Sequence, residues 1–401
     1  MPASVYCIDV AGDGCAFREC TSRGAASPAR HALLTRFVRG LAGTRTANRI
    51  IRGACGQGGR KGSLMASANK SPVELELVNR LVAAHDLLVQ EVGKVVYGQR
   101  EALDLILISL LCRGHSLLLG LPGLGKTLMA RSLARVLDLD FCRIQFTPDL
   151  MPSDITGTDV INEDPETGRR LREFLPGPIF ANLVLADEIN RTPPKTQAAL
   201  LEAMQERQVS VGRTTYALKP PFMVLATQNP IELEGTYVLP EAQLDRFMFC
   251  VRIVYPAPAD EVAIVKGTTT SAVTEVVKVM SAVEVLQLQD IVRGVPVADD
   301  VVEYAVRLVG ATRPDSEAGR KIEEVSRYLS YGASPRASQY LVLGAKARAL
   351  LSRRYHVDFE DVRAMVKPVL RHRLVLNFRS RADRVEADQI VDRVLTSVKA
   401  E

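Results

Sequence analysis

Residues 120–127 read GLPGLGKT and match the pattern G-x-x-x-x-G-K-[ST] of a phosphate-binding loop, or P-loop. In such a loop, backbone N–H groups and the positive end of the following helix face the phosphates of a nucleotide. The apolar run 115–120 (HSLLLG) predicts the strand before the loop, and residues 126–137 (KTLMARSLARVL) have helical spacing. This order of strand, loop and helix favours a P-loop over an ordinary Gly/Pro turn.

The loop predicts binding of ATP with Mg²⁺. We expect the Lys126 ammonium to reach the β- and γ-phosphates and the Thr127 hydroxyl to bind Mg²⁺. The predicted nucleotide contacts here are Gly120, Leu121, Pro122, Gly123, Leu124, Gly125, Lys126, Thr127 and Leu128.

Two adjacent acids follow a second apolar run. Residues 183–188 read LVLADE, so Asp187 and Glu188 come at the end of a predicted strand. An aspartate there would hold Mg²⁺ together with Thr127, and the adjacent glutamate can polarise the water that attacks the γ-phosphate. Adjacent acids also occur as ordinary strand ends. Their position 60 residues after the P-loop favours Mg²⁺-dependent ATP hydrolysis instead.

The composition is that of a folded protein with two or three domains. The chain has 401 residues, of which 47% are hydrophobic and 24% are charged. Its net charge of +5 is unevenly placed, because residues 1–70 hold 11 Lys/Arg and 3 Asp/Glu while the rest hold 40 and 43. The acidic balance of residues 71–401 argues against general nucleic-acid binding.

Two further observations bear on the compartment. No apolar run reaches the roughly 18 residues that a membrane span needs. The seven cysteines include no C-x-x-C pair, so neither a zinc site nor a redox motif is predicted. This cysteine usage suits a reducing environment, and we expect a cytoplasmic protein.

Residues 1–70 are rich in Arg, Gly, Ala and Ser with little periodicity, which predicts a disordered basic extension. Being Arg-rich and poor in acids, the segment superficially resembles a transit peptide. Met65 offers an alternative start directly before strongly helical sequence, so we hypothesise that the natural chain begins near Met65. Ser71 and Glu74 form the S-x-x-E pattern of a capping box, which predicts a helix opening at Ser71.

Short apolar runs alternate with helical or irregular stretches, which predicts a parallel, three-layer α/β domain over residues 71–255. The predicted strands are residues 116–119, 141–146, 182–187, 222–227 and 249–254. Two pieces between them are predicted as hairpins. These are residues 160–174, around the turn-prone NEDPETG, and residues 208–218, which alternate around Gly212.

After Pro256 the sequence becomes predominantly helical, which predicts a second domain over residues 256–401. The candidate helices are residues 261–265, 282–292, 299–312, 336–352, 359–374 and 386–398. Residues 267–271 and 314–321 are predicted to be exposed loops.

The order of P-loop, DE pair, an asparagine after a third strand (VLATQNP) and LDRF resembles the AAA+ ATPases. More narrowly, four strings are similar to the MoxR family: RIQFTPDLMPSDITG (143–157), DEINR (187–191), GTYVLPEAQLDRF (235–247) and GASPRA (332–337). The resemblance covers about residues 71–401. It implies a P-loop AAA+ domain with a five-stranded parallel sheet, followed by a smaller α-helical lid domain.

The resemblance also implies roles that spacing alone does not show. Asn229 would be the first sensor, hydrogen-bonded to the γ-phosphate or its water; otherwise it only begins a turn. Arg246 would be an arginine finger inserted into the neighbouring subunit's site, and Arg336 a second sensor on the lid. Without the family match, Arg246 is simply a surface arginine of an ion pair, and Arg336 is an arginine at the start of a helix. Arg191 would be a further interface arginine. The residues bordering the adenine would be Val96, Tyr97, Gly98 and Gln99.

A finger acting in trans implies a ring, and AAA+ proteins of this kind are typically hexamers. The family implies a chaperone-like motor that remodels or matures protein complexes and sometimes aids metal or cofactor insertion. Its usual partner carries a von Willebrand factor A domain, which would be a separate protein here because the chain has no D-x-S-x-S pattern. Two alternatives are an AAA+ motor acting on nucleic acid and a slow-turnover, nucleotide-controlled scaffold. The two hairpins would line the pore or face a client, or be plain surface ribbons.

Overall fold

The computed structural model describes residues 6–10, 15–19, 72–163, 170–229, 236–269 and 275–400. The chain splits into two compact units, Met1–Asn69 and Lys70–Glu401. In the first unit, strands β1 (Tyr6–Val10) and β2 (Cys15–Glu19) pair as an antiparallel hairpin, which the composition did not predict. The hypothetical start at Met65 and the predicted cap Ser71 lie outside the described residues.

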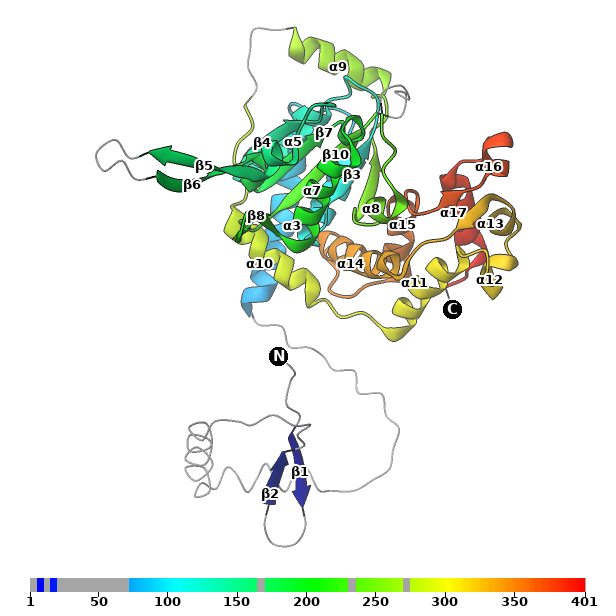
Figure 1. Ribbon diagram of the computed structural model, residues 1–401. Coiled ribbons are helices and arrows are strands. Elements are labelled where there is room, and N and C mark those ends of the chain that lie inside the picture. Colours follow the sequence, from blue (N-terminus) through cyan, green and yellow to red (C-terminus); the bar gives the residue numbers. More distant parts are fainter. Residues whose placement is uncertain are drawn as a thin grey trace. The chain divides into compact units, whose positions relative to one another are not determined.

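The second unit is built on a five-stranded parallel sheet (Figure 1). Its strands are β3 (Ser116–Leu119), β4 (Phe141–Gln145), β7 (Leu183–Asp187), β10 (Met223–Gln228) and β11 (Phe249–Arg252). They lie in the order β11-β3-β10-β7-β4, and every neighbouring pair is parallel. This confirms the predicted sheet, with strand ends that differ by one or two residues.

Alternate residues of the strands face two separate hydrophobic cores, as the two-residue period of a strand requires. On one face, Leu118 and Leu225 pack with helices α3 (Pro72–Gly93), α4 (Arg100–Leu111) and α5 (Lys126–Val136). On the other face, Leu117 and Val224 pack with α6 (Pro152–Thr156) and α7 (Pro194–Glu206). Helices therefore cover both faces, which is the expected three-layer arrangement.

Both predicted hairpins are present. β5 (Gly157–Glu163) pairs with β6 (Arg170–Pro176), and β8 (Gln208–Val211) pairs with β9 (Thr214–Ala217), each antiparallel. The β5–β6 hairpin projects from the sheet (Figure 1). The rings of Phe174 and Tyr216 stack with their centroids 3.9 Å apart, so the two hairpins contact each other. Short elements near them are η1 (Pro178–Phe180), η2 (Ile189–Arg191) and α8 (Glu241–Leu244).

The remainder of the chain is mainly helical and carries one short strand pair. Its elements are α9 (Pro258–Thr268), α10 (Ala282–Arg293), α11 (Asp299–Ala311), α12 (Glu317–Arg320), α13 (Glu323–Tyr328), β12 (Leu329–Tyr331), α14 (Pro335–Leu351), α15 (Phe359–Leu370), β13 (Val375–Leu376), α16 (Phe378–Ala382) and α17 (Ala387–Ser397). No helix among the described residues is long and apolar enough to cross a membrane.

Two predictions for this helical part were wrong. Residues 314–321 were expected to form an exposed loop, but they contain α12, because Ser316 caps the turn by accepting a hydrogen bond from the Gly319 N–H. Gly319 is buried there. The helix expected over residues 359–374 ends at Leu370, and the chain then turns so that the Arg373 N–H bonds the Leu370 carbonyl.

The helical part shares one hydrophobic core with the sheet, and α14 lies at the centre of the contact. This helix packs against α3, α4, α11 and α15. Gly344 is buried in α14, and a Cβ built on it would come 3.1 Å from Phe249 of β11 and 3.1 Å from Met365 of α15. The absence of a side chain at Gly344 therefore lets α14 approach the sheet without displacing these neighbours.

A matched pair of glycine variants tests this contact. Gly344→Val should destabilise the fold by about 1–3 kcal/mol, because added methyl groups overpack a full core. Gly310→Ala in α11 should instead stabilise it by about 0.5–1 kcal/mol, because nothing lies within 4 Å of the added Cβ. Urea unfolding followed by circular dichroism measures both changes. Equal stability of Gly344→Val and the wild type would contradict the close approach.

Candidate functional site

The P-loop lies at the carboxyl edge of the sheet, between β3 and α5. Gly123 and Gly125 have φ values of 82° and 78°, which favour glycine, and nothing lies within 4 Å of a Cβ built on either. At Gly120, by contrast, a Cβ would come 2.8 Å from the Ile253 side chain. The glycines thus serve two purposes: two allow the loop conformation, and one allows the backbone to pass close to the end of β11.

Lys126 begins α5 and turns back over the loop. Its Nζ donates to the carbonyl oxygens of Gly120 at 2.6 Å and Leu121 at 3.0 Å. Burial lowers the pKa of this ammonium, while the charges of Asp187 and Glu188 act in the opposite direction. The ammonium is therefore held inside the loop by carbonyl groups and lies in the field of the two acids.

Thr227 fixes both acids at the end of β7. Its hydroxyl donates to Asp187 Oδ1 at 2.6 Å and accepts from the Glu188 N–H at 2.8 Å. This arrangement follows from the parallel pairing of β7 with β10, which sets Ala226 opposite Ala186. One hydroxyl group thus fixes the Asp187 carboxylate and the backbone at Glu188.

The other Asp187 oxygen faces β4. Arg143 Nε and Nη2 both donate to Asp187 Oδ2, at 2.9 and 2.6 Å. Arg143 Nη2 also donates to Gln145 Oε1 at 2.5 Å. The sequence analysis did not predict a role for Arg143 and Gln145. Both are polar residues at alternate positions of the apolar run FCRIQF, which is a signal that could have identified them. In the structure, Gln145 pairs in register with Asp187.

Glu188 has an unusual backbone conformation and a fixed side chain. Its φ and ψ are 58° and 50°, a left-handed conformation that costs a non-glycine residue about 1 kcal/mol or more. Its Oε2 accepts from Gln145 Nε2 at 2.8 Å and lies 3.0 Å from Arg191 Nε. Such strained residues cluster at functional sites. The predicted interface arginine, Arg191, therefore contacts the acid of its own subunit.

Two other predicted parts lie at the same edge. Asn229 directly follows β10 and is buried, so the strand pairing brings it to the edge where β7 ends in Asp187. In the predicted adenine border, Gln99 Nε2 donates to the Val254 carbonyl at 2.8 Å, one residue beyond the contact of Gly120 with Ile253. Both the P-loop and the predicted adenine border therefore lie beside the end of β11. The border consists of Val96, Tyr97, Gly98 and Gln99.

The guanidinium groups of Arg246 and Arg336 contact other residues. Arg246 Nη1 donates to the Leu201 carbonyl of α7 at 2.6 Å, and Arg336 Nη1 lies 3.6 Å from Asp245 Oδ2. Within the described ranges, these guanidinium contacts are with α7 and with the segment before β11. Neither of the two contacts involves the P-loop or the two acids. The residues predicted to act on ATP thus form two groups.

The residues present suit a magnesium–nucleotide complex. In the described part of the chain, no three His, Cys, Asp or Glu side chains gather into a protein-only metal site. Mg²⁺ typically takes one or two protein oxygens and completes its shell with phosphate and water. Thr127 and Asp187 can supply those oxygens, and the open glycine loop leaves room for phosphates.

Comparison with known proteins agrees with this fold. Residues 115–249 match the ATPase family associated with various cellular activities (AAA), and residues 322–394 match the AAA lid domain. The chain is therefore an ATPase-family protein of the AAA class with its lid.

Longer similarities narrow the class. The chain is 44% identical over 310 residues to Chaperone MoxR1 of Mycobacterium tuberculosis, which covers 77% of this chain and 80% of that protein. It is 36% identical over 297 residues to Protein MoxR of Paracoccus denitrificans, with 71% and 86% covered. A crystal structure from Cytophaga hutchinsonii matches with a TM-score of 0.74 and 42% identity, over 81% of this chain and 96% of that one. The chain belongs to the MoxR family of AAA+ ATPases, which confirms the predicted family and fold.

Removing the P-loop ammonium tests the nucleotide site. Lys126→Ala should weaken ATP binding about 10- to 100-fold, because a hydrogen bond to a charged group contributes about 1.5–3 kcal/mol. Anisotropy of a fluorescent ATP analogue measures the affinity. The control is Lys321→Ala, which removes an exposed ammonium from the end of α12 and should bind as the wild type does. Unchanged binding by Lys126→Ala would contradict the assignment.

Proposed function

We propose that this protein is a Mg²⁺-dependent ATPase that works as a ring, a hexamer as in its class, and that it uses hydrolysis to remodel protein complexes. The observation that carries the proposal is the division of the candidate residues into two groups. The Lys126 ammonium lies in the field of Asp187 and Glu188, whereas the Arg246 and Arg336 guanidinium groups contact Leu201 and Asp245. These contacts support a site that two subunits complete.

The first group binds ATP and activates water. Backbone N–H groups of the loop and the Lys126 ammonium hold the phosphates, while Thr127 and Asp187 would hold Mg²⁺. When bound, Mg²⁺ offsets the negative charge of the phosphates. Glu188 accepts hydrogen bonds from Gln145 and lies against Arg191, so its carboxylate is oriented before it polarises the attacking water. Asn229 would orient that water or the γ-phosphate.

The second group supplies positive charge to a neighbour. A guanidinium aimed at the γ-phosphate stabilises the charge that develops in the transition state, and such a finger raises the rate about 10³- to 10⁵-fold. Arg246 directly follows Asp245 in the sequence, and Arg336 contacts the Asp245 carboxylate. We therefore assign both to the site of the adjacent subunit, with Arg336 acting in trans like Arg246.

The client side of the ring is assigned to the two hairpins. The β5–β6 hairpin exposes Ile161 and Leu175, with 67% and 59% of their surface accessible, on a ribbon that projects from the sheet (Figure 1). Exposed apolar side chains on a projecting ribbon suit contact with a protein client or with the separate von Willebrand factor A partner. Maturation of a complex, including insertion of a metal or cofactor, is the task that the family relationship favours.

A nucleic-acid motor is the second candidate. The acidic balance of residues 71–401 disfavours it, because binding to phosphates relies on Lys and Arg. Stimulation of the ATPase by single-stranded DNA that falls steeply with salt would favour this candidate over the protein remodeller.

The general-base role predicts a trapped state. Glu188→Gln should lower turnover about 100-fold or more and keep ATP binding, because the amide cannot take a proton from water. A phosphate-release assay and the nucleotide titration measure the two effects. Glu303→Gln, on the exposed side of α11, is the matched control and should turn over normally. If Glu188→Gln protein supports the normal function in cells, the slow-turnover scaffold is the better description.

The shared site predicts rescue between two inactive variants. Arg246→Ala lacks the finger but keeps its P-loop, and Lys126→Ala lacks the P-loop ammonium but keeps its finger. Mixed rings should therefore regain part of the ATPase activity, because some interfaces combine two intact halves. The mixing ratio can be varied and the turnover measured at each ratio. Absence of rescue, with mixed rings confirmed by native mass spectrometry, would count against a site shared between subunits.

A further inference from the structure

Arg373, which follows α15, has every one of its N–H groups engaged by a single neighbouring segment and its own helix. The side chain is 1% exposed. Nε donates to Asp245 Oδ1 at 2.8 Å, and Nη2 donates to the carbonyls of Asp245 at 3.1 Å and Phe247 at 2.5 Å. Nη1 donates to the carbonyls of Met248, at 3.2 Å, and Val369. A guanidinium carries five N–H donors, so none is left over.

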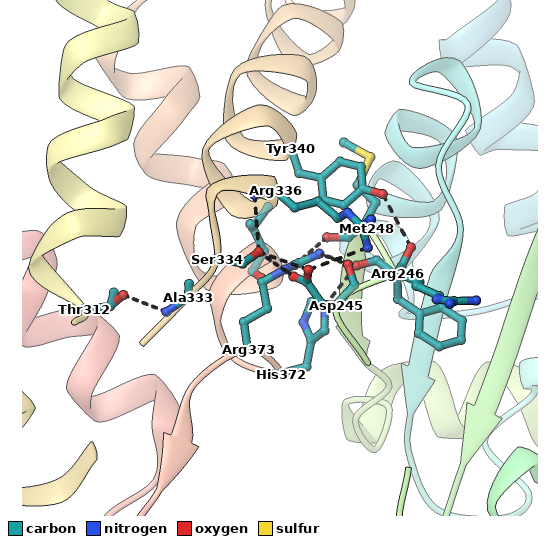
Figure 2. Close-up of polar contacts among 12 residues, drawn as sticks. Asp245, Arg246, Met248, Thr312, Ala333, Ser334, Arg336, Tyr340, His372 and Arg373 are labelled. Carbon is teal, nitrogen blue, oxygen red and sulfur yellow. Dashed lines mark hydrogen bonds and ion pairs between the residues drawn. The ribbon is translucent and has the colours of Figure 1, made fainter. Parts of the chain in front are cut away.

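The lid approaches the same segment from α14 as well. Ser334 caps α14, and its hydroxyl lies 3.0 Å from both carboxylate oxygens of Asp245. Arg336, in the first turn of α14, adds its charge at 3.6 Å. Figure 2 shows Ser334, Arg336 and Arg373 converging on the Asp245 carboxylate. Two lid elements, α14 and the chain after α15, therefore hold one aspartate of the ATPase part.

Arg246 stands between the residues that the lid holds. The carbonyl of Arg246 accepts from the Tyr340 hydroxyl at 3.4 Å, and the carbonyl of Phe247 also contacts His372 Nε2 at 3.0 Å. The Arg246 side chain points the other way, to the Leu201 carbonyl. The backbone on both sides of Arg246 is thus fixed by the lid, while its guanidinium is directed away from the lid.

We propose that Arg373 is a positioning residue for Arg246, through which the lid of one subunit controls hydrolysis in the site of its neighbour. The inference rests on the proposed function, in which Arg246 acts in trans. A displacement of about 1 Å in a reacting group can cost about 100-fold in rate. A lid movement that shifts Arg373 would therefore change turnover next door without touching the nucleotide there.

Lysine at this position gives a sharp test. An ammonium has three donors at one point and cannot reach Asp245, Phe247 and Met248 together. Arg373→Lys should therefore lower kcat about 100-fold, while ATP affinity stays within about twofold because the P-loop of the same subunit is intact. Mixing with Lys126→Ala subunits should restore activity, since those subunits supply correctly placed fingers.

A double variant separates positioning from general damage. If Arg373 acts only through Arg246, then Arg246→Ala/Arg373→Lys should be no slower than Arg246→Ala alone. An additional loss of about tenfold or more in the double variant would overturn the proposal. So would normal turnover of a folded Arg373→Lys ring, or failure of Lys126→Ala subunits to rescue it while they rescue Arg246→Ala.

Two more variants complete the design. Arg354→Lys makes the same substitution at another lid ion pair, with the buried Asp361, and should lower stability with kcat unchanged. If Arg373→Lys fails to fold, Asp245→Asn, which has the same shape as the wild-type side chain, replaces it. Its kcat, its ATP affinity and its rescue by Lys126→Ala subunits are then measured, and the same expected and contradicting results apply. Normal turnover of Arg246→Ala would instead overturn the proposed function itself, and is measured first so that the two failures are distinguished.

Discussion

The parallel pairing of β10 with β3 on one side and β7 on the other is the constraint on which the candidate site depends. It brings the P-loop, the two acids and Asn229, which lie far apart in the sequence, to one edge of the sheet. The same pairing lets the Thr227 hydroxyl contact both Asp187 and the Glu188 N–H. The strained backbone at Glu188 is tolerated because the surrounding sheet fixes it.

Three buried or partly buried aspartates among the described residues are held by arginines. Asp187 has Arg143, Asp245 has Arg373, and the fully buried Asp361 has both Arg348 and Arg354. Removing a charge from water is costly unless it is paired and hydrogen-bonded, and a planar guanidinium can do both at once. The three aspartates lie in different places: the first at the candidate nucleotide site, the second at the lid junction and the third inside the lid.

The sequence predicted the motifs made of neighbouring residues and missed the contacts between residues that are far apart in the chain. The P-loop and the DE pair are recognisable because their chemistry needs neighbouring residues, and the strands because burial imposes apolar runs. Arg373 lies 128 residues from Asp245, so no local pattern could join them. Arg143 depended on strand register, and α12 on one serine cap, which is too weak a pattern beside Pro314. The roles of Arg246 and Arg336 came only from the family resemblance.

The stack of Phe174 on Tyr216 has a mechanical consequence. An isolated two-stranded hairpin is only marginally stable in water. The ring stack links the two hairpins, so a force applied to β5–β6 is shared with β8–β9. Because β8 follows directly from α7, the load reaches the helix whose Leu201 carbonyl holds Arg246. The hairpin pair and the Arg246 side chain are thus both attached to α7.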